Sequence, residues 1–134
     1  MRVLFAAIKT KFDAVKVGNF YADMSGRLYF HEAPQGATYP YCVYQMISDA
    51  PEYYFNSERF EDFLIQFAIF DNDQSGYDIT GYYESLKTMF DDVVLTVSGY
   101  TNVIFERESA RLTRDPEDNV WQYSVDYRVM CEKN

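Results

Sequence analysis

The spacing of hydrophobic residues predicts two amphipathic helices, over residues 3–12 and 78–91. Apolar residues recur every four positions from Leu4 to Phe12, a spacing that places them on one face of a helix. The later segment combines a wide apolar stripe with polar positions, and Asp78 stands where a carboxylate caps a first turn. Each helix is therefore expected to bury one face against the rest of the protein.

A second pattern, the alternation of apolar and polar residues, predicts strands in much of the remaining chain. It is clearest in residues 61–71 and 120–131, where every second residue is large and apolar. Further strands are expected at the shorter apolar stretches, which are 27–33, 41–48, 93–97 and 102–114. Turn-forming residues mark the connection 17–26 and the tight turn 115–119. Residues 50–59 are interpreted as an exposed loop.

The order of these elements predicts an α+β fold, in which a mostly antiparallel sheet packs against two helices as a sandwich. No repeat or linker interrupts the sequence, so residues 1–134 are expected to form a single domain. With 134 residues, 48% of them hydrophobic, the chain is large enough to bury a proper core.

The charge of the chain excludes one class of partner. A formal net charge of −9 repels phosphate groups, which argues against binding to nucleic acids. The sequence contains neither a basic amphipathic helix nor an apolar stretch long enough to span a membrane. Lys9 and Lys11 interrupt the first apolar stretch, so no signal peptide is expected there. Cys42 and Cys131 lack C-x-x-C spacing, which fits a reducing cytoplasm.

One stretch partly matches a calcium-binding loop. Asp71, Asp73, Ser75 and a following glycine reproduce the first half of that loop. Tyr82 stands where the loop requires a bidentate glutamate, so the second half does not match. A turn between a strand and a helix accounts for this composition without a cation. No metal ion is therefore expected.

Catalytic groups are also scarce. His31 is the only histidine, which excludes a His-based triad or a site with several histidine ligands. We interpret His31 as a partly exposed strand residue, Cys131 as a buried inert thiol, and Cys42 as a structural residue. The carboxylates occur in surface-like contexts, and no phosphate-binding loop is present. We therefore expect neither an enzyme nor a cofactor.

Aromatic residues indicate a contact surface. The chain contains 13 tyrosines and 11 phenylalanines, and Tyr53, Tyr54 and Phe55 are consecutive in the predicted loop that ends at Arg59. A tyrosine ring tolerates burial while its hydroxyl stays hydrated, a property that suits protein interfaces. These residues are therefore candidates for a subunit or partner interface.

The predicted strand 102–114 is unusually charged. It carries, in order, Glu106, Arg107, Glu108, Arg111 and Arg114. One interpretation is a solvated sheet face, or an edge strand that charges protect from wrong pairing. The other is a subunit contact in which matched charges fix the register and exclude wrong partners.

Two stretches carry a resemblance to a known family. In APQGATYPYCVYQMISDAP (33–51), Pro34 and Pro40 bracket a loop that contains Gly36 and precedes an apolar strand. This stretch resembles the signature region of phage tail-completion proteins, also called tail terminators or tail-to-head joining proteins. RLTRDPEDNVWQYSVDYRV (111–129) resembles their closing hairpin, and the order of elements agrees along nearly the whole chain.

The resemblance implies a structural protein of the virion, located in the tail and assembled in the host cytoplasm. Such proteins form a ring of identical subunits, expected to be a hexamer, that caps the tail tube and ends its polymerisation. The ring contacts the tail tube protein on one side and the head connector on the other. DNA passes through it without specific binding, and no membrane is involved. The loop of Pro34, Gly36 and Pro40 then offers a fixed shape to a neighbouring subunit or to the tube.

Two alternatives stay open from the residues themselves. The chain is also compatible with another ring protein of the head–tail connection. A dimeric α+β module that binds a small apolar ligand in an aromatic-lined pocket is compatible as well. A ring-shaped assembly favours the first two functions, and a stable dimer with a wide pocket favours the third.

Overall fold

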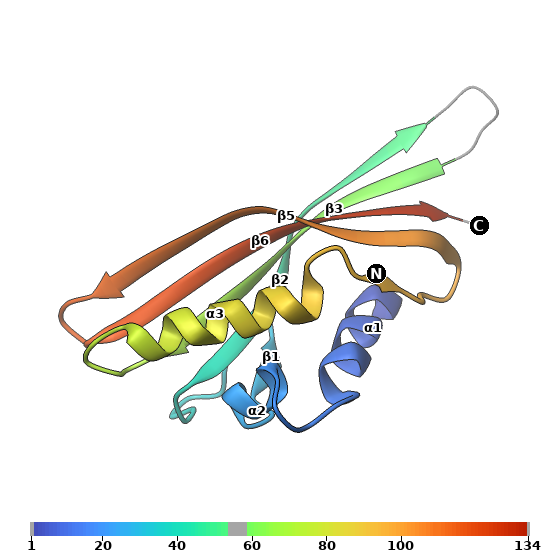
Figure 1. Ribbon diagram of the computed structural model, residues 1–134. Helices are drawn as coiled ribbons and strands as arrows, with labels where there is room; N and C mark the ends of the chain where they lie inside the picture. The colour runs from blue at the N-terminus through green and yellow to red at the C-terminus, as the bar shows by residue number, and fades with distance from the viewer. Residues whose placement is uncertain (1, 54–58, 134) are drawn as a thin grey trace.

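The computed structural model describes residues 2–53 and 59–133, shown in Figure 1. Its helices are α1 (Arg2–Asp13), α2 (Phe20–Met24) and α3 (Tyr77–Phe90). Its strands are β1 (Leu28–Phe30), β2 (Tyr41–Tyr53), β3 (Arg59–Asp71), β4 (Val94–Leu95), β5 (Tyr100–Asp115) and β6 (Val120–Lys133). They form one six-stranded sheet in the order β1-β2-β3-β6-β5-β4.

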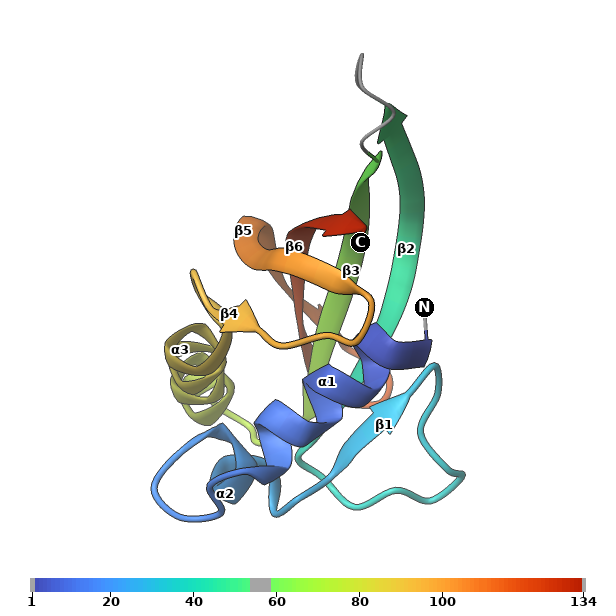
Figure 2. The ribbon, with the colours of Figure 1, turned by 90° about the vertical axis from the view of Figure 1, so that its right-hand side faces the viewer.

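The sheet is mostly antiparallel, as predicted, and β1 with β2 is its one parallel pair in the described chain. The helices gather on one side of the sheet, as Figure 2 shows, so the predicted α+β class is confirmed. The predicted number of helices is wrong, because residues 2–53 and 59–133 form three helices instead of two.

The core lies between the helices and the sheet. Leu4, Ile8 and Phe12 of α1 are fully buried, which confirms the face predicted from their spacing. Alternate residues of the two central strands complete the core, and those fully buried are Phe63, Ile65, Phe67, Ile69, Val125, Tyr127 and Val129. Burial of one such side chain stabilises the fold by about 1.5–3 kcal/mol. The alternation in 61–71 and 120–131 thus predicts the buried face correctly.

The additional helix lies inside the connection 17–26. The side chain of Asn19 accepts a hydrogen bond from the backbone N–H of Ala22 at 3.3 Å and caps α2. Phe20 and Met24 of this helix are fully buried in the core. The polar and small residues that indicate turns therefore flank a short helix. This helix has five residues, too few to show the periodic spacing of an amphipathic helix.

Residues 50–59 were predicted as a loop, and this prediction is wrong for the described part. Ala50–Tyr53 belong to β2, and Arg59 begins β3, with Tyr53 opposite Arg59 in the antiparallel register. Pro51 is tolerated in β2 because no described strand pairs with the outer edge of β2 there, so no backbone N–H is needed. Tyr54 and Phe55 lie outside the described residues.

Several boundaries also differ from the prediction. β1 ends at Phe30, and the exposed His31 leaves the strand with φ 71°, so His31 is not a strand residue. Asp78 does not cap α3. The N-cap is Gly76, whose φ of 70° favours glycine, and a β-carbon there would lie 2.9 Å from the ring of Trp121. The positive φ and the close approach of this ring both favour glycine at this position, and the ring contact is invisible in the sequence.

Candidate functional site

The sheet face opposite the helices carries a row of polar side chains. Gln45 Nε2 donates to Gln66 Oε1 at 3.3 Å, and Gln66 Nε2 donates to Asp126 Oδ1 at 3.1 Å. Ser109 Oγ donates to Asp126 Oδ2 at 3.2 Å, which extends the row from β2 across β3 and β6 to β5. We call this surface the open face. Its side chains form hydrogen bonds with one another across neighbouring strands, and they present amide groups at the surface.

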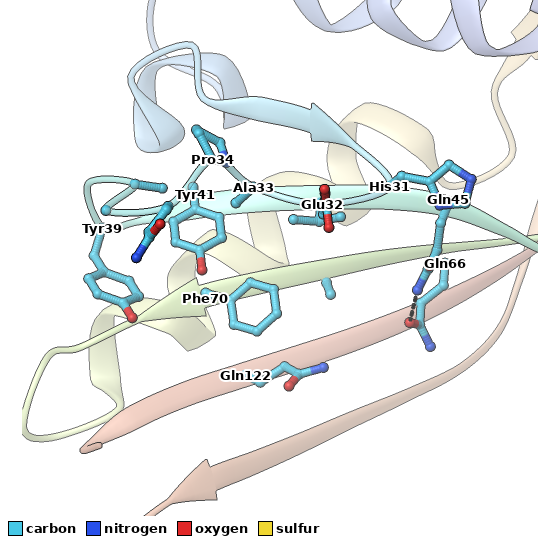
Figure 3. A pocket seen from close by; sticks show the side chains of 15 residues that line it. His31, Glu32, Ala33, Pro34, Tyr39, Tyr41, Gln45, Gln66, Phe70 and Gln122 are labelled. Carbon is cyan, nitrogen blue, oxygen red and sulfur yellow. Dashed lines mark hydrogen bonds between the residues drawn. The ribbon is translucent and has the colours of Figure 1, made fainter.

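The loop between β1 and β2 lies beside the open face and borders an open groove of about 590 Å³, shown in Figure 3. Tyr39 and Tyr41 stack with ring centroids 5.4 Å apart, and Tyr41 stacks on Phe70 at 5.1 Å. The other residues that line the groove are His31, Glu32, Ala33, Pro34, Gln35, Gly36, Ala37, Val43, Gln45, Gln66, Ala68 and Gln122. The groove thus joins an aromatic stack to a floor of glutamines.

The loop is fixed in place at its second proline. The guanidinium group of Arg27 donates to the backbone oxygen of Pro40 at 2.9 Å and to that of Tyr39 at 3.2 Å. Gly36 has φ 76°, in the region that favours glycine, and lies with Pro34 along the groove. Pro34 and Gly36 therefore line one wall of the groove, and Pro40 is the point at which Arg27 holds the loop.

The structure separates the three arginines that the sequence groups together. Arg107 Nε lies 3.3 Å from Asp91 Oδ1, and Arg107 Nη1 donates to Tyr83 Oη of α3. Arg114 donates to Asn119 and lies over the Trp121 ring at 5.5 Å. Arg107 thus ties β5 to a helix, and Arg114 braces the turn before β6.

Arg111 occupies a different environment. It is exposed on β5 and stands opposite Ser124 of β6, on the open face. The positive charge of Arg111 is therefore exposed at the surface of the subunit. The sequence shows the three charges but not the face of the strand on which each one lies, because an irregularity between Arg107 and Ser109 shifts the alternation.

Of the predicted aromatic contact, the structure describes the backbone of Tyr53, at the end of β2. Figure 1 shows the β2–β3 hairpin projecting beyond the helices. Tyr53 and Arg59 form the last described pair of the hairpin. The position is compatible with a contact surface, because the hairpin extends away from the core.

A polar contact inside the fold was not found from the sequence. Tyr127 Oη donates to Asp91 Oδ1 at 2.5 Å and connects β6 to the end of α3. Burial, with a smaller contribution from this hydrogen bond, raises the pKa of Tyr127. The sequence signals only that Tyr127 lies on the buried face. Its partner is far along the chain, and only the packing brings the two together.

Both cysteines are buried, and hydrogen bonds within the turn before α3 engage Asp73 and Ser75. Burial raises the pKa of the Cys42 thiol, and Cys131 is buried as predicted. Ser75 Oγ donates to Asp73 Oδ2 at 2.9 Å and accepts from the N–H of Tyr77 at 3.2 Å, which closes the turn before α3. In residues 2–53 and 59–133, no three acidic, histidine or cysteine side chains are grouped to hold a metal ion. None of the helices in that part of the chain has the length and apolar character to span a membrane.

Comparisons with known proteins bear on the fold. No family model and no curated protein matches the sequence. Among solved structures, a chain from the virion of a native gene transfer agent particle is similar, with a TM-score of 0.77 at 10% sequence identity. The similarity covers 98% of this chain and 96% of that chain. This protein therefore shares its fold, from end to end, with a chain of a gene transfer agent virion.

Proposed function

We propose that this chain is a structural, non-enzymatic protein of a phage-like virion. The observation that carries the proposal is the match to a chain of a gene transfer agent virion over 98% of this chain, with a TM-score of 0.77. The resemblance of residues 33–51 and 111–129 to tail-completion proteins supports the same class of protein independently of the structure.

Within that class, we propose a tail terminator that forms a ring on the tail tube, with six subunits as the expected number. A contact between two different surfaces of the same chain closes into a ring when its rotation is a whole fraction of a turn, and closure ends growth. The net charge of −9 suits a ring around a DNA channel, because it gives the phosphates little to bind. Another ring protein of the head–tail connection is the nearest alternative.

The candidate contacts are distributed over three parts of the subunit. We assign the tube contact to the end of the β2–β3 hairpin, where Tyr53, Tyr54, Phe55 and Arg59 occur. Neighbouring subunits meet at the charged strand β5, with Arg107, Arg111 and Arg114. The loop with Pro34, Gly36 and Pro40 faces a neighbour or the tube.

The function is tested by electron microscopy of lysates of the parent phage, with and without the gene for this chain. A tail terminator predicts over-long tails, or tails of normal length that do not join heads, when the gene is absent. Replacement of the gene restores normal virions. Normal virions without the gene would reject the tail role.

The groove on the open face supports a second candidate function, the dimeric ligand-binding module. Its stack of Tyr39, Tyr41 and Phe70 suits an apolar ring, and its glutamines suit a polar substituent. Sedimentation of the purified chain distinguishes the candidates, because a module of this kind stays a dimer whereas a terminator forms rings.

A further inference from the structure

Both edges of the sheet are covered by strands over only part of their length. At one edge, β4 pairs with β5 through Val94 and Leu95 alone, so no described strand lies beside residues 109–114. At the other edge, β1 pairs with β2 only at Cys42–Tyr44, so no described strand lies beside residues 46–53. Figure 2 shows the upper part of β2 without a neighbour on its outer side. Such edges present free N–H and C=O groups to another chain.

The hydrogen bonds identify which backbone groups of β5 point outward. The N–H of Phe105 donates to Val93, and its C=O accepts from Asp92, so both groups point away from β6. The register of β5 with β6, followed past the irregularity at Arg107–Ser109, gives the outward groups beyond it. These are the backbone groups of Ala110, Leu112 and Arg114.

On β2, hydrogen bonds beside β1 and the register with β3 identify the outward backbone groups. Cys42 donates its N–H to Arg27, and the C=O of Tyr44 accepts from His31, so both residues face outward toward β1. The register with β3, followed past the irregularity between Met46 and Ser48, gives the outward groups further along. These belong to Asp49, Pro51 and Tyr53, of which Pro51 offers only its C=O.

The two open edges differ in charge. Residues 109–114 of β5 contain Arg111 and Arg114 and no acidic residue. Residues 46–53 of β2 contain Asp49 and Glu52 and no basic residue. Like edges of two copies repel each other, whereas a β5 edge attracts a β2 edge. The charges thus oppose symmetric pairing of two identical edges and favour pairing of unlike edges.

We propose that the open edge of β5 in one subunit pairs, main chain to main chain, with the open edge of β2 in a second copy of this chain. The inference rests on the proposed ring and names the surfaces that build it. Because the two edges lie on opposite sides of one sheet, every subunit has one of each to offer. Head-to-tail pairing of this kind leaves no free edge once the ring closes.

The first test removes one outward backbone donor. Ala110→Pro deletes an N–H that does not pair with β6, so the β5–β6 hairpin keeps its hydrogen bonds. Ala110→Ser is the matched control that keeps the donor. Assembly of the full chain is followed by mass photometry and negative-stain microscopy, and folding by circular dichroism. We expect Ala110→Pro to raise the concentration for half-assembly at least about tenfold, and Ala110→Ser to assemble as the wild type does.

The second test uses charge and stays informative even if the proline variant does not fold. One protein carries Arg111→Glu with Arg114→Glu, and the other carries Asp49→Lys with Glu52→Lys. Each alone brings like charges together at every contact, and we expect at least about a tenfold loss of assembly. Mixed in equal amounts, the two are expected to alternate around the ring and to recover assembly.

The outcomes separate this inference from the proposed function. Wild-type rings whose assembly none of these variants weakens would overturn the edge pairing and leave the ring in place. Recovery in the mixture, with loss in each protein alone, supports the pairing of unlike edges. A wild-type chain that forms no ring at any concentration overturns the pairing together with the ring itself.

Discussion

The two faces of the sheet use the same strand alternation in different ways. On the helix side of β3, Phe63, Ile65 and Phe67 are fully buried and contact side chains from other elements. On the open face, Gln66 is half-buried and hydrogen-bonds across strands to Asp126. The buried face therefore supplies stability, while the open face holds polar groups in place at little gain in stability.

The largest expected effect comes from breaking the buried face. Phe67 is fully buried, and its ring lies 4.8 Å from that of Phe90 and 5.7 Å from that of Tyr127. Phe67→Ala leaves a cavity among these rings, so the free energy of unfolding is expected to fall by about 3–5 kcal/mol. Urea denaturation measures the change. A loss below about 1 kcal/mol would mean that the helices do not pack on this face.

A smaller loss is expected from the polar contact within the buried face. Tyr127→Phe keeps the ring but removes the donor to Asp91, at a cost of about 1–3 kcal/mol. Tyr123→Phe is the matched control on the same strand face. The raised pKa of Tyr127 adds a pH test, because its stabilising effect is complete below the ordinary value of 10.0 and is lost at higher pH. The wild type should therefore lose stability above pH 10 more steeply than Tyr127→Phe.

At the end of β3, on the same side as its buried residues, a substitution is expected to stabilise the protein. Asp71 is buried, its Oδ1 accepts from the N–H of Asn72, and burial raises its pKa above the ordinary 3.8. The folded protein therefore disfavours the charged form of Asp71. The resulting loss of folding stability is absent below pH 3.8, where the carboxyl is protonated in both states, and complete above the raised pKa. Asp71→Asn is expected to raise the unfolding free energy at pH 7 by about 1 kcal/mol.

Thermal unfolding of the Asp71→Asn variant over a pH series measures this gain. Asp73→Asn, at a half-buried position of the same turn, is its control. Equal stability of Asp71→Asn and the wild type at pH 7 would show that the carboxylate is not penalised.

The smallest effect is expected on the open face. Gln66→Ala removes two hydrogen bonds between half-exposed side chains, and water replaces them, so the loss should stay below about 1 kcal/mol. The same denaturation experiment as for Phe67→Ala measures it. If Gln66→Ala lowered the free energy of unfolding as much as Phe67→Ala does, the two faces would not differ in their contribution to stability.

Much of the fold was predictable because it depends on local periodicity. The spacing from Leu4 to Phe12 and the alternation in 61–71 and 120–131 identify the buried faces correctly. The predictions for residues 17–26 and, within the described chain, for 50–53 and 59 are wrong, since caps and an edge proline look like turn residues in a sequence. The groove and the unequal positions of Arg107, Arg111 and Arg114 depend on strand order and on an irregularity, which periodicity does not encode.

The sequence by itself determined the α+β class, the buried side of each central strand, and the acidic character of the chain. Those properties follow from the types of neighbouring residues and their period, which act over a few positions. The tertiary structure alone decided that β1 lies parallel to β2, that Tyr127 meets Asp91, and that two oppositely placed edges stay open. These depend on contacts between residues far apart in the chain, whose energy becomes available only when the whole sheet has formed.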